Sequence, residues 1–308
     1  MTNGARFGRS GWMCSAATDW RRFGRARRGR SQPTFLSVAN SPDGYACPVP
    51  EDIHASLDAS RPSIARIYDY WLGGKDNFSS DREEAERVLA VYPPLKHMVR
   101  ENRLFLSRSV SWLAGLGIRQ FLDIGSGLPT AQNTHEVAQA VDPACRVVYS
   151  DNDPVVLSHA RALLSGDRVA VASGDLREPG GITGSAAVRE LIRPGEPTAV
   201  ILAMVMHFID PGTARRVTRE LVDWLAPGSY LVISTASAAE DAVASDMQSK
   251  YTASSTWNHS QEVIRSFFAG TELMAPGLAD AGDWLPGAAA MTSTPKSIRV
   301  IAGIGRKP

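Results

Sequence analysis

Apolar residues change their spacing along this 308-residue chain. From about residue 82 to residue 117 they recur every three or four positions, as on one face of a helix. A short pattern, DREEAERVLAVY, precedes a longer one, LKHMVRENRLFLSRSVSWLAGLG, which Gly115 and Gly117 end. Asn102 falls on the apolar face of the longer pattern, where a polar side chain needs a partner. These patterns predict two helices ahead of the core.

Beyond residue 118, continuous apolar runs of strand length alternate with helical patterns. Such runs are typical of parallel strands that are covered on both faces. The predicted strands are 119–125, 145–151, 168–175, 198–209, 229–235, 272–276 and 297–303. Helices are expected at 130–141, 154–164, 211–226 and 260–269. This alternation predicts an α/β fold, a Rossmann-like, doubly wound, mostly parallel seven-stranded sheet.

The first 50 residues carry eight arginines and two aspartates, whereas the rest of the chain is mildly acidic. They have Gly, Pro and Ser but no sustained periodicity, so we expect residues 1–55 to be a disordered basic leader. The alternative is a basic arm that contacts nucleic acid or an anionic surface. Because the body is acidic, nothing in it indicates a nucleic-acid partner.

The three cysteines are far apart and have no metal-ligand spacing. We therefore expect neither a disulfide framework nor a metal site, as is usual in a reducing compartment. No apolar run approaches the roughly 20 residues of a membrane span, and no signal peptide is apparent. The sequence favours a cytoplasmic protein without a membrane partner.

Ligands of such sheets bind beyond the carboxyl ends of the strands. The first predicted strand ends in DIGSGLPT, where Gly125 and Gly127 allow a tight turn and the close approach of a ligand. The dinucleotide fingerprint needs a third glycine where this chain has Thr130, which weakens the case for pyrophosphate. Asp123 suits the ammonium group of S-adenosylmethionine. Alternatively, its carboxylate only stabilises the glycine loop.

Three further strand ends carry polar side chains. Asp151 lies where an acid can accept bonds from two ribose hydroxyls, and Asp175 can accept from an adenine amino group. Each alone is equally consistent with a structural turn or cap, but together they indicate a nucleoside site. His207 ends the fourth strand and is a candidate general base, with packing as the alternative and His259 as a weaker candidate.

Three long blocks carry a resemblance to a known family. ARIYDYWLGGKDNFSSDREEAE, FLDIGSGLPTAQNTHEVAQAVDPACRVVYSDNDPVVLSHARALL and LAPGSYLVIS resemble the S-adenosyl methyltransferase family, class I enzymes long catalogued as a domain of unknown function. The resemblance runs from about residue 60 to the last residues. It implies a methyltransferase domain over 56–308, with a helical lid or substrate region at 56–117 and a Rossmann-like core at 118–308.

The resemblance also implies how S-adenosylmethionine is held. Its methionine part would lie on the glycine loop, its ribose on the acid after the second strand and its adenine on the pair after the third. These expected cofactor residues are Asp123, Gly125, Gly127, Asp151, Asn152, Asp175 and Leu176. The family's superfamily usually has a further glycine where this chain has Pro129.

The block at 66–78 mixes aromatic residues, paired glycines and charges. One interpretation is a lid that closes over cofactor and acceptor. Tyrosine or tryptophan faces, such as those of Tyr68 and Trp71, would then contact the sulfonium, and Lys75 or Arg66 would hold the carboxylate. The other is a structural clasp, in which the aromatic residues pack a helix, the glycines end it and Lys75 is solvated.

The sequence thus predicts an S-adenosylmethionine-dependent methyltransferase that acts on a small-molecule acceptor by in-line displacement. Two alternatives stay open. A non-catalytic regulatory module would bind the same cofactor, and an NAD-dependent oxidoreductase would share the strand order. Fold alone does not identify the acceptor, because many chemistries share this scaffold.

Overall fold

The computed structural model describes residues 58–130, 132–164, 166–287 and 297–308. The predicted disordered leader, 1–55, lies outside the described residues. All of the elements described below belong to a unit that spans Pro50–Pro308.

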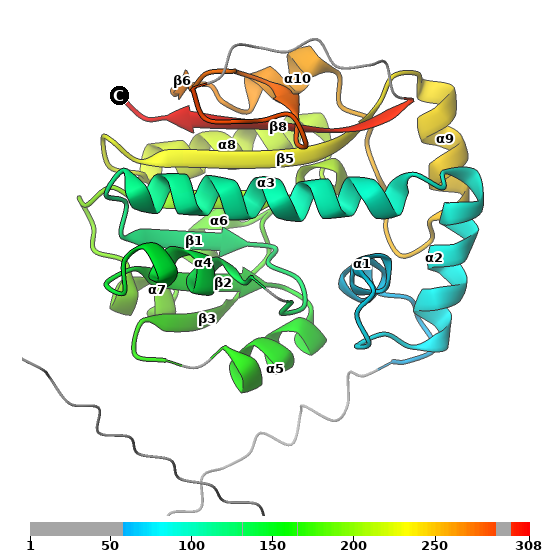
Figure 1. Ribbon diagram of the computed structural model, residues 1–308, viewed down its shortest axis with the longest axis horizontal. Helices are drawn as coiled ribbons and strands as arrows, with labels where there is room; N and C mark the ends of the chain where they lie inside the picture. Colours follow the sequence, from blue (N-terminus) through cyan, green and yellow to red (C-terminus); the bar gives the residue numbers. More distant parts are fainter. Residues whose placement is uncertain (1–57, 131, 165, 288–296) are drawn as a thin grey trace, which may run out of the picture. The chain divides into compact units, whose positions relative to one another are not determined.

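One mixed sheet forms the core (Figure 1). Its strands are β1 (Gln120–Ile124), β2 (Arg146–Asp151), β3 (Val169–Ser173), β4 (Ala199–Ala203), β5 (Tyr230–Ala238), β6 (Glu272–Leu273), β7 (Ala279–Asp280) and β8 (Ile298–Arg306). The order is β3-β2-β1-β4-β5-β8-β6, with β7 also paired to β8. Strands β1 to β5 are parallel and β8 is antiparallel to β5, which confirms the predicted Rossmann-like class.

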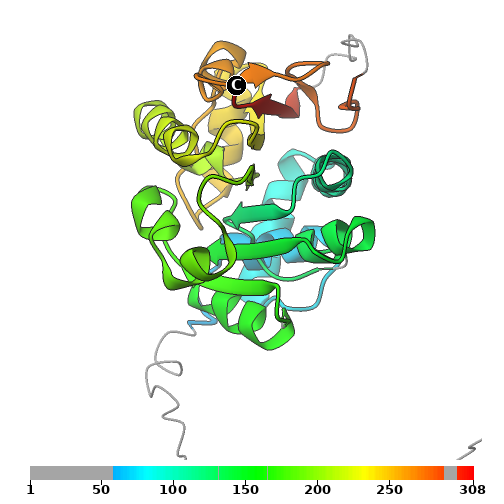
Figure 2. The ribbon, with the colours of Figure 1, turned by 90° about the vertical axis from the view of Figure 1, so that its left-hand side faces the viewer.

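Helices cover both faces of this sheet, as the view in Figure 2 shows. Phe121 packs into a core with α3 (Leu95–Gly115), whereas its neighbour Leu122 packs into a second core with α8 (Pro211–Trp224). Alternate residues of one strand therefore point into two buried layers. The remaining helices of the core are α4 (Thr134–Val141), α5 (Pro154–Leu163), α6 (Pro179–Thr183), α7 (Ala186–Leu191) and α10 (Gln261–Ser266).

Several predicted bounds are wrong. Within the described residues the sheet has eight strands instead of seven, because the two-residue β7 is too short to produce a periodic pattern. The strand expected at 198–209 ends at Ala203, since Met204 takes a left-handed φ of 58° and a short 3-10 helix, η2 (Met206–Phe208), follows. The helix expected from residue 130 begins at Thr134.

Three helices lie beyond the carboxyl ends of the parallel strands: α1 (Ile64–Leu72), α2 (Ser79–Val91) and α9 (Asp241–Lys250) (Figure 1). Helix α2 was predicted. Helix α1 is amphipathic over nine residues and ends at Gly73, whose φ of 88° is left-handed. Helix α9 buries no side chain completely, so it lacks the apolar stripe from which a helix is predicted.

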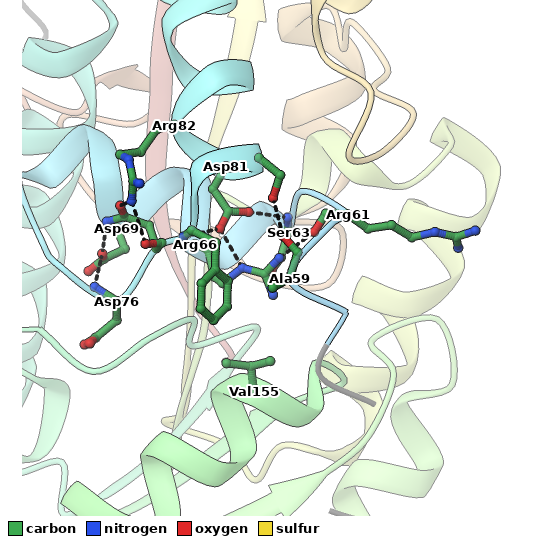
Figure 3. A network of polar contacts seen from close by, with 12 residues as sticks. Ala59, Arg61, Ser63, Arg66, Asp69, Asp76, Asp81, Arg82 and Val155 are labelled. Carbon is green, nitrogen blue, oxygen red and sulfur yellow. Dashed lines mark hydrogen bonds and ion pairs between the residues drawn. The ribbon is translucent and has the colours of Figure 1, made fainter. Parts of the chain in front are cut away.

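A buried ion pair joins α1 to α2 (Figure 3). The guanidinium Nε of Arg66 donates to Asp81 Oδ2 over 2.7 Å, and the two side chains are 4% and 0% exposed. Asp81 also accepts from the backbone N–H groups of Ser63 and Phe78. The hydroxyl of Ser63 in turn donates to Asp153, the N-cap of α5. These contacts fix α1 against α2 and against the core.

We expect Asp81→Asn to destabilise the protein by about 3–5 kcal/mol, because it leaves the charge of Arg66 buried without a partner. Denaturant unfolding at neutral pH measures this change. Glu83→Gln is the matched control, since Glu83 is an exposed carboxylate in the same helical turn and should change stability by less than about 0.5 kcal/mol. Equal effects of the two substitutions would contradict the role given to the ion pair.

Candidate functional site

A cavity of about 650 Å³ lies at the carboxyl ends of β1 to β5. Its lining comes from the loops that follow these strands, from α1 and α3, and from α9 and the segment after it. The position includes the point between β1 and β4 where the strand order reverses, at which doubly wound sheets bind ligands. Its volume suits a cofactor together with a small molecule.

The glycine loop after β1 forms one wall. Gly125 and Gly127 have left-handed φ values of 70° and 67°, and a Cβ at Gly125 would overlap the side chain of Val205. The N–H of Gly127 donates to Asp151 Oδ2 over 3.0 Å. The backbone thus passes close to the cavity in a conformation that other residues rarely adopt.

The acids after β2 and β3 lie together, as the sequence predicted. Asp151 is 9% exposed, and burial raises the pKa of its carboxyl group. Asn152 donates to Asp175 over 3.3 Å. Burial opposes ionisation of Asp175, but the backbone N–H and guanidinium of Arg177 outweigh it and lower the pKa. These residues and Leu176 all line the cavity.

Asp123 at the end of β1 is almost fully buried and lines the cavity. It accepts a hydrogen bond of 2.6 Å from Thr134 at the start of α4. Burial raises the pKa of Asp123 to about 6, although the Thr134 hydroxyl acts in the opposite direction. The carboxylate is therefore bound to α4 and not to the glycine loop, and it faces a ligand site in a poorly solvated position.

The two candidates in the 66–78 block are placed differently. Tyr68 lines the cavity, but its hydroxyl accepts from Asn102 over 2.9 Å and donates to the carbonyl of Val99. Asn102 in turn accepts from Ser234 Oγ over 2.6 Å, so the polar residue on the apolar face of α3 has its partners. Because the hydroxyl of Tyr68 is already hydrogen-bonded, we expect a ligand to contact its ring.

Lys75 is exposed and is not among the described residues that line the cavity, so the expectation that it holds the cofactor does not fit this structure. The physical reason is that the chain turns away after α1. The next glycine, Gly74, makes room for Asp69, whose carboxylate accepts from the N–H of Asp76 and from Asn77. Arg66 lines the cavity with its guanidinium bound to Asp81. The charged side chains of the block therefore have the contacts of the structural clasp, whereas Tyr68 and Trp71 line the cavity.

His207 lies in η2 after β4, is 9% exposed and lines the cavity. Its Nδ1 is buried without a hydrogen-bond partner among the described residues. Burial, with His259 nearby, lowers the pKa of His207 to about 3. The weaker candidate, His259, is buried and donates from Nε2 to the carbonyl of Met206 over 3.0 Å, so it has a structural role.

Trp71 of the 66–78 block lines the cavity, but sequence reasoning missed the other aromatic side chains beside His207, which are Phe208, Tyr251 and Trp257. They come from separate elements, so no local spacing relates them. Within the described residues, no cluster of three or more His, Cys, Asp or Glu has the arrangement of a metal site. No described helix has the length and apolarity that crossing a bilayer requires.

A family model described as S-adenosyl methyltransferase matches residues 50–308. The chain belongs to the S-adenosyl methyltransferase family. This confirms the predicted family and the predicted cofactor, S-adenosylmethionine, and it disfavours the NAD-dependent alternative. The glycine loop and the adjoining carboxylates fit such a cofactor, because they place close backbone and hydrogen-bond acceptors in one cavity.

Two crystal structures are similar over most of the chain. A methyltransferase candidate from Thermobifida fusca YX is 40% identical, with a TM-score of 0.74, and the match covers 85% of this chain and 99% of that one. A DUF574 family protein from Streptomyces avermitilis MA-4680 is 34% identical, with a TM-score of 0.74 and coverage of 82% and 99%.

A curated relative is more distant. Carboxy-S-adenosyl-L-methionine synthase of Klebsiella pneumoniae strain 342 is 26% identical over 168 residues. The match covers 51% of this chain and 61% of that enzyme, so this chain spans less than two thirds of the relative's length.

We expect Asp151→Asn to weaken binding of S-adenosylhomocysteine by about tenfold or more, because a charged acceptor is lost from a buried site. Titration calorimetry on the full chain measures the affinity. Lys75→Ala should leave it unchanged within about twofold, since Lys75 lies outside the cavity lining. The reverse ranking of the two variants would show that the ligand site lies elsewhere.

Proposed function

We propose that the chain transfers the methyl group of S-adenosylmethionine to a small-molecule acceptor. The observation that carries this proposal is the continuity of the cavity. It extends from the loops after β1, β2 and β3 to those after β4 and β5. A site for the cofactor alone would need only the first part.

In this proposal the nucleoside lies over β1 to β3. Asp151 accepts from the ribose hydroxyls, and Asp175 with Leu176 contacts the adenine. The glycine loop contacts the methionine part, and Asp123 pairs with its ammonium group. Support comes from the shared cavity lining and from the hydrogen bond that orients Asp151 on Gly127.

The cofactor supplies an electrophilic methyl group, so the protein has to align the acceptor and exclude water. His207 is a weak base, because its pKa of about 3 means that the imidazole binds a proton poorly at neutral pH. Its buried Nδ1 also has no carboxylate or carbonyl partner among the described residues that would stabilise an imidazolium. We therefore assign His207 a hydrogen bond to the acceptor through Nε2 instead of the predicted role of general base.

The proposal is tested with purified full chain and S-adenosylmethionine labelled in the methyl group. We expect label to move into a small-molecule fraction of an acceptor pool, together with formation of S-adenosylhomocysteine. Binding of the cofactor without any labelled product would instead support the non-catalytic module. No binding at all would reject both.

Turnover should survive in part when His207 is replaced by Gln, since the amide keeps a hydrogen-bonding group in the cavity but cannot act as a base at neutral pH. We expect His207→Ala to lower the rate more than His207→Gln. The rate of methyl transfer at saturating cofactor measures both. Complete loss of methyl transfer in both variants would instead support His207 as the general base.

Cofactor affinity should rise with pH through about 6, the pKa of Asp123, and then level off. Below that value the carboxyl group is protonated and cannot pair with an ammonium group, so affinity changes by up to about tenfold per pH unit. Calorimetry between about pH 5 and pH 7 measures the profile. Asp123→Asn should flatten it, and any slope that is left belongs to Asp151, whose pKa is also raised.

A further inference from the structure

If the nucleoside lies over β1 to β3 as proposed, the rest of the cavity is at the ends of β4 and β5. These strands are on the opposite side of β1 from β2 and β3, so their loops are separated from the adenine end. Its lining comes from η2, the end of β5, α9 and residues 251–258, together with Trp71 of α1. We call this part the β4–β5 half of the cavity.

Three aromatic rings from three elements form one wall of this half. The centroids of Trp71 and Tyr251 are 6.4 Å apart with an interplanar angle of 28°, and those of Phe208 and Tyr251 are 6.2 Å apart with an angle of 25°. The rings are therefore nearly parallel. A wall of this kind favours a flat molecule that stacks with an offset.

Charge separates the two halves. The lining residues up to Arg177 include six aspartates and four arginines, which are Asp58, Asp69, Asp123, Asp151, Asp153, Asp175, Arg61, Arg66, Arg103 and Arg177. Among the described lining residues from Ala203 onward there is no Asp, Glu, Lys or Arg. Arg177 reaches this half, where it donates to the carbonyl of Phe208 over 3.3 Å, but its charge is paired with Asp175. An ionised ligand would lose its hydration without gaining an unpaired counter-ion from the residues after Ala203, so an uncharged ligand is favoured.

Most polar side chains of the β4–β5 half are already bonded. Gln248 accepts from the N–H and hydroxyl of Thr256 and donates to two backbone carbonyls. Asn258 is bonded to the backbone of Ala238. In contrast, the side chains of Tyr251 and His207 have no hydrogen bond among the described residues, and burial raises the pKa of Tyr251, so its hydroxyl stays protonated. Both side chains can bond a polar group of a ligand.

The wall is held rigidly by α2. Glu84 is fully buried and accepts from the N–H of Thr252 over 2.5 Å, from its hydroxyl and from the N–H of Ala253 over 2.8 Å. These contacts fix the backbone next to Tyr251. The aromatic surface is thus formed before a ligand arrives, which lowers the entropic cost of binding.

We propose that the β4–β5 half of the cavity is the acceptor site and takes an uncharged, flat aromatic molecule that presents one hydroxyl group. This rests on the proposed function. The hydroxyl oxygen can accept from Tyr251 with one lone pair and attack with the other. The attacking lone pair forms the bond to the methyl carbon while the carbon–sulfur bond breaks, the electron pair stays on sulfur as a thioether, and the hydroxyl proton is released to water.

The test measures binding of four probes to the full chain saturated with S-adenosylhomocysteine. We expect 2-naphthol and isoquinoline to bind at least about tenfold more tightly than 2-naphthoate, which is an anion, and decahydro-2-naphthol, which is not flat. We expect methyl transfer to 2-naphthol and not to isoquinoline, because the Tyr251 hydroxyl occupies the single lone pair of the ring nitrogen. Equal binding of all four probes, or tighter binding of 2-naphthoate, would overturn the inference.

Substitutions of Tyr251 test whether 2-naphthol binds against the aromatic wall. Tyr251→Leu should weaken 2-naphthol binding about tenfold and leave S-adenosylhomocysteine affinity within about twofold. Tyr251→Phe keeps the ring if the first variant does not fold, and should weaken 2-naphthol but not naphthalene. Tyr70→Leu is the matched control, since Tyr70 is an aromatic residue of α1 that bonds Glu86 and does not line the cavity. Unchanged 2-naphthol binding in both Tyr251 variants would overturn the inference.

The two proposals fail in different ways. If S-adenosylhomocysteine does not bind, the proposed function fails and the acceptor site fails with it. If it binds and the probes do not distinguish charge or flatness, the cofactor site stands and the acceptor class is wrong.

Discussion

Both faces of the parallel sheet are buried, and the rest of the molecule follows from that constraint. Residues of β1 point alternately into a core under α3 and a core under α8, so neither face can hold polar chemistry. Polar side chains can reach a ligand only where the strands end. Asp123, Asp151 and Asp175 all occupy such positions, and the N-terminal helices roof the cavity that results.

Charged side chains are unevenly distributed in this cavity, so its two ends suit different ligands. One side offers carboxylates with raised or lowered pKa values, which in our proposal bind the ribose, adenine and ammonium groups. The other side offers rings and a protonated hydroxyl. A charged methyl donor and an uncharged acceptor would therefore bind at opposite ends of the cavity. Their reacting atoms would meet near the end of β1.

The sequence predicted the sheet well because parallel strands are read as continuous apolar runs. The proposed nucleoside residues followed from position, since Gly125, Gly127, Asp151 and Asp175 lie at or just after the ends of those runs. The aromatic side of the cavity could not be predicted in the same way. Tyr251 and Phe208 are 43 positions apart and meet only through the fold, and α9 has no apolar stripe. Local pattern also could not reveal that Arg66 is bound to Asp81.

Helix α2 carries two buried acids, Asp81 and Glu84, three positions apart on one face. The first holds α1, and the second holds the backbone beside Tyr251. Two parts of the cavity lining, α1 and the segment after α9, are therefore bonded to the same helix. A movement of α2 would shift both parts together, so the shape of the cavity would change as a unit.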